Sequence, residues 1–463
     1  LVASETSRII FSKAAVSSAS LDRSEIIMAE KYILTLDIGT TTIRSFIYNS
    51  KAETIGSAVD QADYFYHLKV PIFVDAKLLA AQITAMGIST QRSTFINWSR
   101  ETGKPFHRFI TWKDLRADKL VNQWNESYTW KVNVNAGAYV LYLIMRSQKF
   151  RAGSVLKFMN TQVCWSTSYL NLLFNYSTTG GKIHVSDVSS ASATGFFDPF
   201  CMEWGGWALS LFKIPRSVLP TIVDTAGKHF GTTTPDIWGH AIPIISCMAD
   251  QTASMWGSCC FEVGDVKLTM GTGTFFNINT GSVPHANVAG LYPIVGWRLG
   301  DELVYSAEGS NNDTASIIKW AQNLGLFDNP QDSASIAESV PDTDGVYFIP
   351  AFSGLGAPYN DGSAASGFVG MKPSTTKAHL VRAVLESLAF RIAQLYYCVR
   401  EENNYQFNII RVDGGVSNND FIAQLVADLT GLRVERPVHT EMSSLGCAHV
   451  VGLQLGTYHW WRT

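Results

Sequence analysis

The chain has 463 residues, of which 46 % are hydrophobic and 16 % charged, a composition that supports large buried cores and excludes a disordered chain. Its formal net charge of −3, without a clustered run of Lys or Arg, argues against a nucleic-acid-binding protein. The longest apolar runs, such as AYVLYLIM from Ala138, are shorter than the ~20 residues that a membrane-spanning helix needs, so we expect no membrane span.

The first thirty residues differ in composition from the rest of the chain. They are rich in small and hydroxyl side chains, and a domain-like sequence, AEKYILTLDIG, follows Met28. Scattered basic residues also fit a transit peptide, but Glu5, Asp22 and Glu25 are unusual in such peptides, which are poor in acids. We therefore expect residues 1–30 to be a disordered or untranslated leader.

From Lys31 the sequence predicts a three-stranded meander. The near-continuous apolar run YILTLD leads to the turn IGTTT, a second strand RSFIYN, a second turn and a third strand IGSAV. A further short buried strand, QITAMGIS, begins at Gln82.

The first of these turns is suited to binding phosphate. Gly39 lacks a Cβ, so backbone amides can approach a ligand closely, and the neighbouring threonines supply hydroxyl donors. Arg44 adds a fixed positive charge, and Asp37 at the strand end is a candidate to hold Mg²⁺ through water. The same residues also fit an ordinary hairpin turn. The candidate phosphate-binding set is Asp37, Gly39, Thr40, Thr41, Thr42 and Arg44.

A second strand and turn of the same kind lie in the other half of the chain. IPIIS predicts a buried strand that ends near Asp250, and QTASMWGSC after it has a helical pattern. GDVKLTM and FFNINTG then flank the turn formed by Gly271, Thr272 and Gly273. Because this turn repeats the Gly/Thr character of the first, the sequence predicts a duplicated domain in which each copy offers a phosphate-facing hairpin.

The remaining sequence alternates helices and strands. TASIIKWAQNLGLF and HLVRAVLESLAFRIAQLYYCV have helical spacing, and NNDFIAQLVADLTG is a helix with an Asn/Asp start and a Gly stop. IIRVDGG predicts a strand that enters a glycine turn, where Gly414 and Gly415 permit flat contact with a base or ribose. The pattern is typical of an α/β protein with at least two mixed-sheet domains.

Asp250 is the candidate general base. It follows a buried strand at the expected mouth between the two halves, and transfer of a phosphoryl group to an alcohol needs a carboxylate near the hydroxyl. An aspartate that opens a helix is also a common N-cap residue, so both roles stay open for this side chain.

Several motifs together resemble those of one enzyme family, the FGGY carbohydrate kinases. LDIGTTTIR, GISTQR, WKDLR, ADQTASMWG, KLTMGTGTF, AFSGLGAPYNDG, RVDGG and LGCAHVVGL occur in the order seen in that family. GFVGMKPSTTKAHLVRAVLE, from Gly367, is similar to its C-terminal signature. The resemblance covers Lys31 to Tyr458 and is strongest to the glycerol kinases, in particular to a divergent animal branch.

This resemblance implies an α/β fold of the actin/hexokinase-like (ribonuclease H-like) ATPase type, with two domains and a cleft between them. We expect an N-terminal domain at 31–257, internally shortened, and a C-terminal domain at 258–463. The implied ligands are ATP with Mg²⁺ and a small polyol. The positions that match the ATP site are those of the two turns together with Ala315, Lys319, Gly414, Gly415 and Asn419, and those that match the polyol site are Arg92, Ser93, Trp112, Phe150, Asp250, Gln251 and Phe275.

Some of these positions depart from the family pattern. Ser93 stands where a glycerol kinase has a Glu that binds a glycerol hydroxyl, and Phe150 stands where a substrate-contacting Tyr is usual. Ala315 and Lys319 fall where Gly and Gln are common. The stretch from His67 to Gly87 is also shorter than in the family, as is the region after Val155, which missing exons in the gene model would explain.

The predicted function is ATP-dependent phosphorylation of glycerol to sn-glycerol 3-phosphate by in-line transfer, with Asp250 as the base. A kinase for another small polyol or ketose and a non-catalytic nucleotide-binding paralogue are the alternatives. Seven cysteines without paired spacing favour a reducing compartment, so we expect a cytoplasmic enzyme. A homodimer also stays open.

Overall fold

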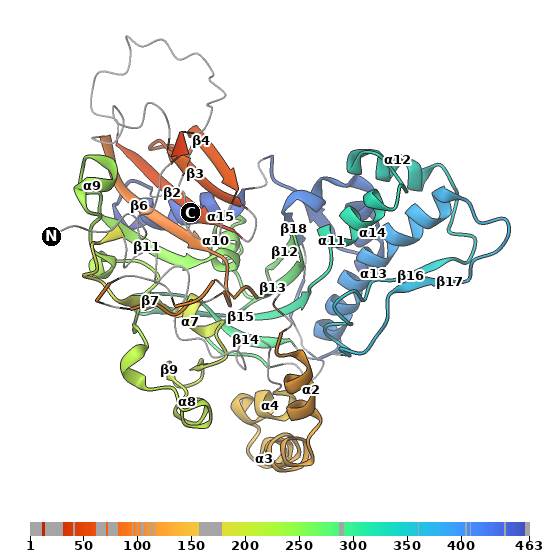
Figure 1. The fold of residues 1–463 in the computed structure, drawn as a ribbon, viewed down its shortest axis with the longest axis horizontal. Coiled ribbons are helices and arrows are strands. Elements are labelled where there is room, and N and C mark those ends of the chain that lie inside the picture. Colours follow the sequence, from red (N-terminus) through yellow and green to blue (C-terminus); the bar gives the residue numbers. More distant parts are fainter. Residues whose placement is uncertain are drawn as a thin grey trace, which may run out of the picture.

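The computed structural model (Figure 1) covers most of the chain from Lys31 to Tyr458. The described residues are 12–13, 31–39, 42–61, 71–72, 82–94, 96–99, 101–102, 106–108, 110–112, 114, 116–156, 178–286, 291–359, 361–402, 405–407, 409–438 and 441–458. The predicted leader, apart from its residues 12–13, lies outside them.

The first half of the chain builds a five-stranded sheet in the order β11-β6-β2-β3-β4. As predicted, β2 (Tyr32–Ile38), β3 (Thr42–Tyr48) and β4 (Thr54–Gln61) form an antiparallel meander. The predicted strands β6 (Ile83–Thr90) and β11 (Ile244–Ala249) lie parallel to β2 on its other side. Every residue of β2 is buried, because hydrophobic clusters cover both faces of this sheet.

The second half builds a six-stranded sheet with a related topology. Its order is β14-β15-β13-β12-β18-β19, and its strands are β12 (Val266–Met270), β13 (Thr274–Gly281), β14 (Tyr292–Leu299), β15 (Glu302–Asn311), β18 (Ile409–Asp413) and β19 (Arg433–Glu435). In each sheet the first strand of the meander lies between its hairpin partner and a later, parallel strand. This shared pattern supports the predicted duplication.

Helices of the second half lie beside its sheet, on the right in Figure 1. They are α11 (Ala315–Asn323), α12 (Ser333–Glu338), α13 (Lys377–Glu402) and α14 (Asp420–Thr430). Val381, Leu385 and Leu388 of α13 are in the main hydrophobic core with the strands of this sheet, which explains the helical apolar spacing. Gly431 ends α14 in the left-handed conformation (φ +70°), as its glycine stop predicted.

The other elements are short. The strands are β1 (Ser12–Lys13), β5 (Pro71–Ile72), β7 (Val185–Asp187), β8 (Phe197–Asp198), β9 (Glu203–Trp204), β10 (Thr221–Val223), β16 (Tyr347–Ile349) and β17 (Gly367–Val369). The helices are α2 (Asp118–Glu126), a π-helix (Thr129–Ala136), α3 (Gly137–Met145), α4 (Gln148–Val155), α7 (Val188–Ser192), α8 (Gly206–Phe212) and α9 (Pro235–Trp238). Single 3₁₀ turns are Arg216–Val218, Lys228–Phe230, Pro330–Asp332 and Gly415–Asn418.

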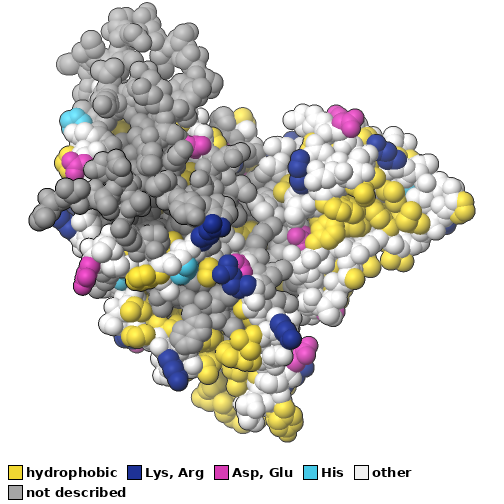
Figure 2. Space-filling view, in the orientation of Figure 1, with side chains coloured by type: hydrophobic (Ala, Val, Ile, Leu, Met, Phe, Trp, Pro, Cys, Tyr) yellow, Lys and Arg dark blue, Asp and Glu magenta, His cyan; other side chains and the backbone are white. Residues whose placement is uncertain are grey.

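Hydrophobic side chains gather on the right-hand lobe and at the lower end of the face drawn in Figure 2. On the right-hand lobe, β16 and β17 leave Tyr347 and Val369 exposed. At the lower end, α3 leaves Val140 and Ile144 exposed. The apolar run from Ala138 is therefore a surface helix here, and no helix among the described residues is both long and apolar enough to cross a bilayer.

The last helix, α15 (Met442–Gln454), returns to the first sheet and packs against β2, β6 and β11. It therefore contacts the predicted N-terminal domain, although the predicted boundary assigns it to 258–463. α15 also crosses α10 (Asp250–Gly257) with their backbones in contact. A Cβ on Gly446 would lie 1.7 Å from the carbonyl oxygen of Ala253, so only glycine fits there.

This crossing predicts a large effect of one added methyl group. Gly446→Ala should lower the free energy of unfolding by about 3 kcal/mol or more, because a backbone oxygen cannot move aside as a side chain can. Gly206→Ala in α8 is the matched control, since the described residues leave open space around Gly206, and it should change stability by less than about 1 kcal/mol. Urea unfolding followed by circular dichroism measures both. Equal stability of the two variants would contradict the close crossing.

Candidate active site

A cavity of about 1210 Å³ opens where the ends of the two sheets face each other. Almost every predicted site residue among the described residues lines it. The lining includes Asp37, Gly39, Thr42, Arg44, Arg92, Ser93, Trp112, Phe150, Asp250, Gln251, Gly271, Thr272, Gly273, Phe275, Ala315, Lys319, Gly414 and Gly415. Thr40 and Thr41 lie outside the described residues.

Asn419, which was predicted to face the adenosine, is not among the residues that line this cavity, and its place on the nucleotide side stays a prediction. It is the N-cap of α14, where its side-chain oxygen accepts a hydrogen bond from the Ile422 amide at 3.1 Å. Its amide nitrogen donates to the Ser333 hydroxyl at 3.0 Å. Because both ends of the side chain hold helices together, Asn419 has a structural role.

The first Gly/Thr turn is a tight hairpin at the cavity wall. The Gly39 amide donates to the Thr42 carbonyl at 3.0 Å, and Asp37 and Arg44 are cross-strand partners on either side of the turn. The Arg44 guanidinium forms an ion pair with Glu441, which precedes α15 and also lines the cavity. A phosphate that binds Arg44 would therefore share it with, or displace it from, Glu441.

The second turn is packed more closely than the first. A Cβ on Gly273 would lie 2.8 Å from the Asn311 carbonyl, which makes glycine necessary at this position. The carbonyl oxygen of Gly271 accepts from the amide of Ala315 at 3.2 Å, so this turn satisfies a donor at the start of α11. Gly414 (φ +85°) approaches Met270, and this contact brings the glycine turn after β18 beside the second hairpin.

Asp250 is the first residue of α10, directly after β11. The N-cap residue is Ala249, so the alternative role of Asp250 as an N-cap is wrong. Its Oδ1 accepts from the Gln251 amide at 2.8 Å and lies 3.5 Å from Arg92 Nε. Burial raises the pKa of the Asp250 carboxyl to about 6, against the opposing charge of Arg92 and with help from the negative charge of Asp37.

Asp37 has the features of a cation-binding carboxylate. Burial raises its pKa above the ordinary value, and its Oδ1 is buried without a hydrogen-bond partner among the described residues. Two carboxylates, Asp37 and Asp250, line the same cavity close enough for the charge of one to raise the pKa of the other. Carboxylate oxygens are the protein ligands that a hydrated Mg²⁺ ion prefers, so Asp37 fits such an ion.

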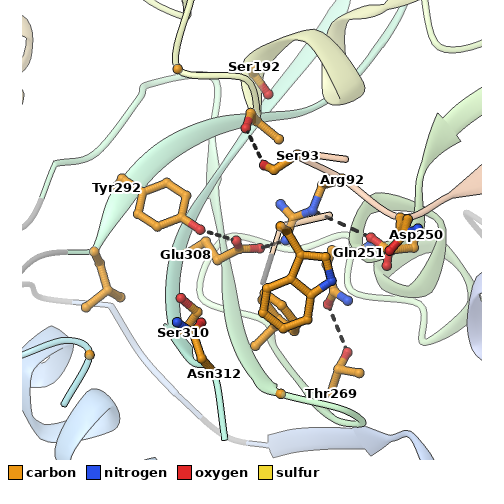
Figure 3. Close-up of a pocket in the computed structure, with 18 of the residues that line it drawn as sticks. Arg92, Ser93, Ser192, Asp250, Gln251, Thr269, Tyr292, Glu308, Ser310 and Asn312 are labelled. Atoms are coloured by element: carbon orange, nitrogen blue, oxygen red, sulfur yellow. Dashed lines mark hydrogen bonds and ion pairs between the residues drawn. The ribbon is translucent and has the colours of Figure 1, made fainter. Parts of the chain in front are cut away.

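Three of the predicted polyol-binding residues, Arg92, Ser93 and Gln251, lie near Asp250 in the cavity (Figure 3). The Arg92 guanidinium lies over the Phe275 ring, 5.6 Å from its centroid, and the Trp112 ring packs edge-on against Phe275. The two aromatic rings form an apolar wall next to the Arg92 guanidinium. A ligand with a carbon chain and hydroxyl groups needs both kinds of surface. Ser93 has a left-handed backbone (φ +53°) and donates its hydroxyl to the Ala193 carbonyl at 2.8 Å.

A buried network behind Gln251 was missed in the sequence. Lys267 has no exposed side-chain surface, and its Nζ lies 3.0 Å from Asp413 Oδ1 and 3.2 Å from Gln251 Oε1. The Thr269 hydroxyl also donates to Gln251 Oε1, at 2.9 Å. Since these donors occupy the amide oxygen, Gln251 can offer its amide nitrogen to a ligand. The available signal was a lysine inside an apolar strand, because a buried charge has to be paired.

Comparison with known proteins gives consistent matches along the chain. Residues 69–257 match the N-terminal domain and residues 266–454 the C-terminal domain of the FGGY family of carbohydrate kinases. Glycerol kinase 5 of Danio rerio is 45 % identical over 470 residues, which cover 93 % of this chain and 88 % of that protein. A glycerol kinase of Pseudothermotoga lettingae is 35 % identical over 457 residues, covering 93 % and 91 %.

A solved structure is similar over the same length. The structure of Plasmodium falciparum glycerol kinase with ADP has a TM-score of 0.75 at 27 % identity, covering 93 % of this chain and 91 % of that one. This similarity confirms the predicted two-domain, actin/hexokinase-like fold.

The buried ion pair of Lys267 predicts a stability effect. Lys267→Met leaves Asp413 buried without its cation, so it should lower the free energy of unfolding by about 3–5 kcal/mol. Asp413→Asn in the same chain should recover part of this loss. Lys372→Met, which removes a surface ion pair with Asp344, is the control and should leave the midpoint of urea unfolding nearly unchanged. Similar midpoints for Lys267→Met and Lys372→Met would contradict the assignment.

Proposed function

Because the chain belongs to the FGGY family of carbohydrate kinases, phosphotransferases that act on an alcohol, we propose that it uses ATP to phosphorylate glycerol to sn-glycerol 3-phosphate. The relationship predicted from the motifs is confirmed, and the most similar relatives quoted above are glycerol kinases. The observation that carries the proposal is the shared cavity. Asp250 lines it together with the two glycine turns and with the Arg92, Trp112 and Phe275 group.

Asp250 acts as the general base in this proposal. The glycerol hydroxyl attacks the γ-phosphorus, its proton passes to the Asp250 carboxylate, and the bond from phosphorus to the bridging oxygen of ADP breaks in line. Burial supports this role, because a carboxylate with a pKa of about 6 holds a proton more strongly than an ordinary aspartate and is still ionised at neutral pH.

The two turns would hold the phosphates from opposite sheets. Gly39 and Gly273 allow the backbone to approach, while Thr42 and Thr272 supply hydroxyls, with Thr40 and Thr41 as further predicted donors. Gly414 and Gly415 would face the adenosine, and Ala315 and Lys319 line the same side of the cavity.

Mg²⁺ fits beside the first turn. Asp37 would hold it, with Asp250 nearby, because Asp37 Oδ1 is buried without a partner among the described residues. When bound, Mg²⁺ neutralises charge on the phosphate oxygens. Asp37, on the buried strand β2, would hold the ion through its carboxylate.

Glycerol would bind through two donors and an apolar wall. The Arg92 guanidinium and the Gln251 amide nitrogen can donate to hydroxyls, and the Trp112 and Phe275 rings can pack against the carbon chain. Domain closure over both ligands would exclude water from the γ-phosphate.

Another small polyol or a ketose is the second candidate substrate, and Ser93 favours it. The Ser93 hydroxyl is donated to a backbone carbonyl, and Phe150 has no hydroxyl, so neither offers the contact that a glycerol kinase has at these positions. A homodimer and a cytoplasmic location stay predictions.

A turnover assay tests the proposed function. Release of ADP should depend on glycerol, and should be weaker or absent with dihydroxyacetone and with pentuloses. Asp250→Asn should reduce kcat by at least about 100-fold while ATP binding stays within about twofold, since proton transfer by a positioned base contributes about 10²–10⁴-fold. A preference for a ketose would favour the second candidate. ATP binding without turnover on any polyol would show a non-catalytic paralogue.

The pKa of Asp250 predicts the pH profile. The base must be ionised, so kcat/KM should be constant above pH 7 and should fall about tenfold per pH unit below about pH 6. Nucleotide binding measured over the same pH range separates this effect from titration of ATP. An acid limb near pH 4, the range of an exposed aspartate, would contradict a buried base at this position.

A further inference from the structure

A row of polar side chains crosses the second sheet underneath the polyol side of the cavity. In the strand register, Tyr292 of β14 is opposite Glu308 of β15, Glu308 is opposite Asn277 of β13, and Asn277 is opposite Lys267 of β12. Residues directly opposite one another in neighbouring strands project from the same face of a sheet. The Glu308, Asn277 and Lys267 side chains are buried, and Tyr292, Glu308 and Lys267 form part of the cavity wall.

Each half of this row contacts one of the two residues that face the polyol. Glu308 Oε2 forms an ion pair with Arg92 Nη2 at 2.5 Å, and Tyr292 donates its hydroxyl to Glu308 Oε1 at 2.5 Å (Figure 3). At the other end, Lys267 and Asn277 donate to Gln251 Oε1, at 3.2 and 3.4 Å. Glu308 and Lys267 therefore both have partners, as buried charged groups require, and Asn277 is bonded through its amide nitrogen.

Glu308 has no place in the predicted site, yet it is a fully buried carboxylate in the cavity wall. Removing a carboxylate from water is costly unless it is paired and hydrogen-bonded. Its two oxygens are engaged by Arg92 and Tyr292, and its side chain has no exposed surface. It can therefore affect a substrate only through the residues that it holds.

We infer that Glu308, held by Tyr292, is a positioning residue that keeps the Arg92 guanidinium directed at the polyol and away from Asp250. This inference rests on the proposed polyol kinase function.

The geometry around Arg92 explains why such a residue is needed. The guanidinium lies between two carboxylates, with Nε 3.5 Å from Asp250 Oδ1 and Nη2 2.5 Å from Glu308 Oε2. The shorter contact is to Glu308, and the Phe275 ring supports the guanidinium from one side. Without the Glu308 charge, the strongest remaining attraction for Arg92 is Asp250. Arg92 would then close on the base and lose the geometry needed to donate to a hydroxyl.

Kinetics of Glu308→Gln test the inference. This variant keeps the shape but removes the charge, and KM for the polyol should rise roughly 10- to 100-fold, the range for a lost hydrogen bond to a charged group. KM for ATP should stay within about twofold, because the two oxygens of Glu308 contact Arg92 and Tyr292, on the polyol side of the row. Glu386→Gln, which breaks the Arg382 ion pair on α13 outside the cavity, is the matched control and should leave both KM values unchanged.

Two further variants keep the test decisive if Glu308→Gln folds poorly. Tyr292→Phe retains every charge and should raise KM for the polyol roughly 3- to 10-fold. Tyr305→Phe removes a comparable hydroxyl contact on β15, to the Pro199 carbonyl, and should not change KM. In a double-mutant cycle, Glu308→Gln should add little to Arg92→Met, since a residue that acts only through Arg92 has no effect once Arg92 is gone.

The outcomes separate this inference from the proposed function. A selective rise of KM for the polyol, with a non-additive cycle, supports positioning. Wild-type KM in Glu308→Gln and Tyr292→Phe, or equal rises of both KM values, would overturn positioning while the kinase activity stands. Absence of turnover by the wild-type enzyme on every polyol would overturn the proposed function and this inference with it.

Discussion

Pairing of buried charge is the constraint on which the cleft depends. Lys267 and Asp413 are both buried between the helix that begins with Asp250 and the glycine turn after β18, and neither could remain there without the other. Arg92 and Glu308 satisfy the same requirement on the polyol side. These two ion pairs join four different segments of the chain, so the polar groups beside Asp250 are held in place before any ligand arrives.

The repeated sheet topology explains how the phosphate turns come to face each other. In both sheets the central hairpin ends at the cleft, with a later parallel strand beside it, so each copy presents a Gly/Thr turn at the same edge. α10 and α15 pack between the sheets at a backbone contact that only glycine permits. This contact fixes the start of α10, and with it Asp250, relative to both turns.

Local signals in the sequence predicted much of this arrangement. The meander from Tyr32, the long helix α13, the caps of α14 and the strand-to-helix junction at Asp250 all follow from patterns within a few residues. A lysine within an apolar strand indicated a buried charge, but the partners of Lys267, Glu308 and Tyr292 could not be predicted, because they depend on strand register and on residues far apart in the chain. The return of α15 to the first sheet is also a tertiary effect, which its own sequence does not encode.

The family motifs also predicted individual site residues, and the structure places most but not all of them in the cavity. Arg92, Gln251 and Phe275 lie in the cavity as the motif implies, whereas Asn419 is a helix cap whose local sequence had already predicted a helix start.

The most direct test of the central claim is a crystal structure with a non-hydrolysable ATP analogue, Mg²⁺ and glycerol. A glycerol hydroxyl should lie within about 2.6–3.2 Å of the Asp250 carboxylate, with the γ-phosphate between the two Gly/Thr turns. A nucleotide bound away from these turns, or glycerol bound out of reach of Asp250, would contradict this claim.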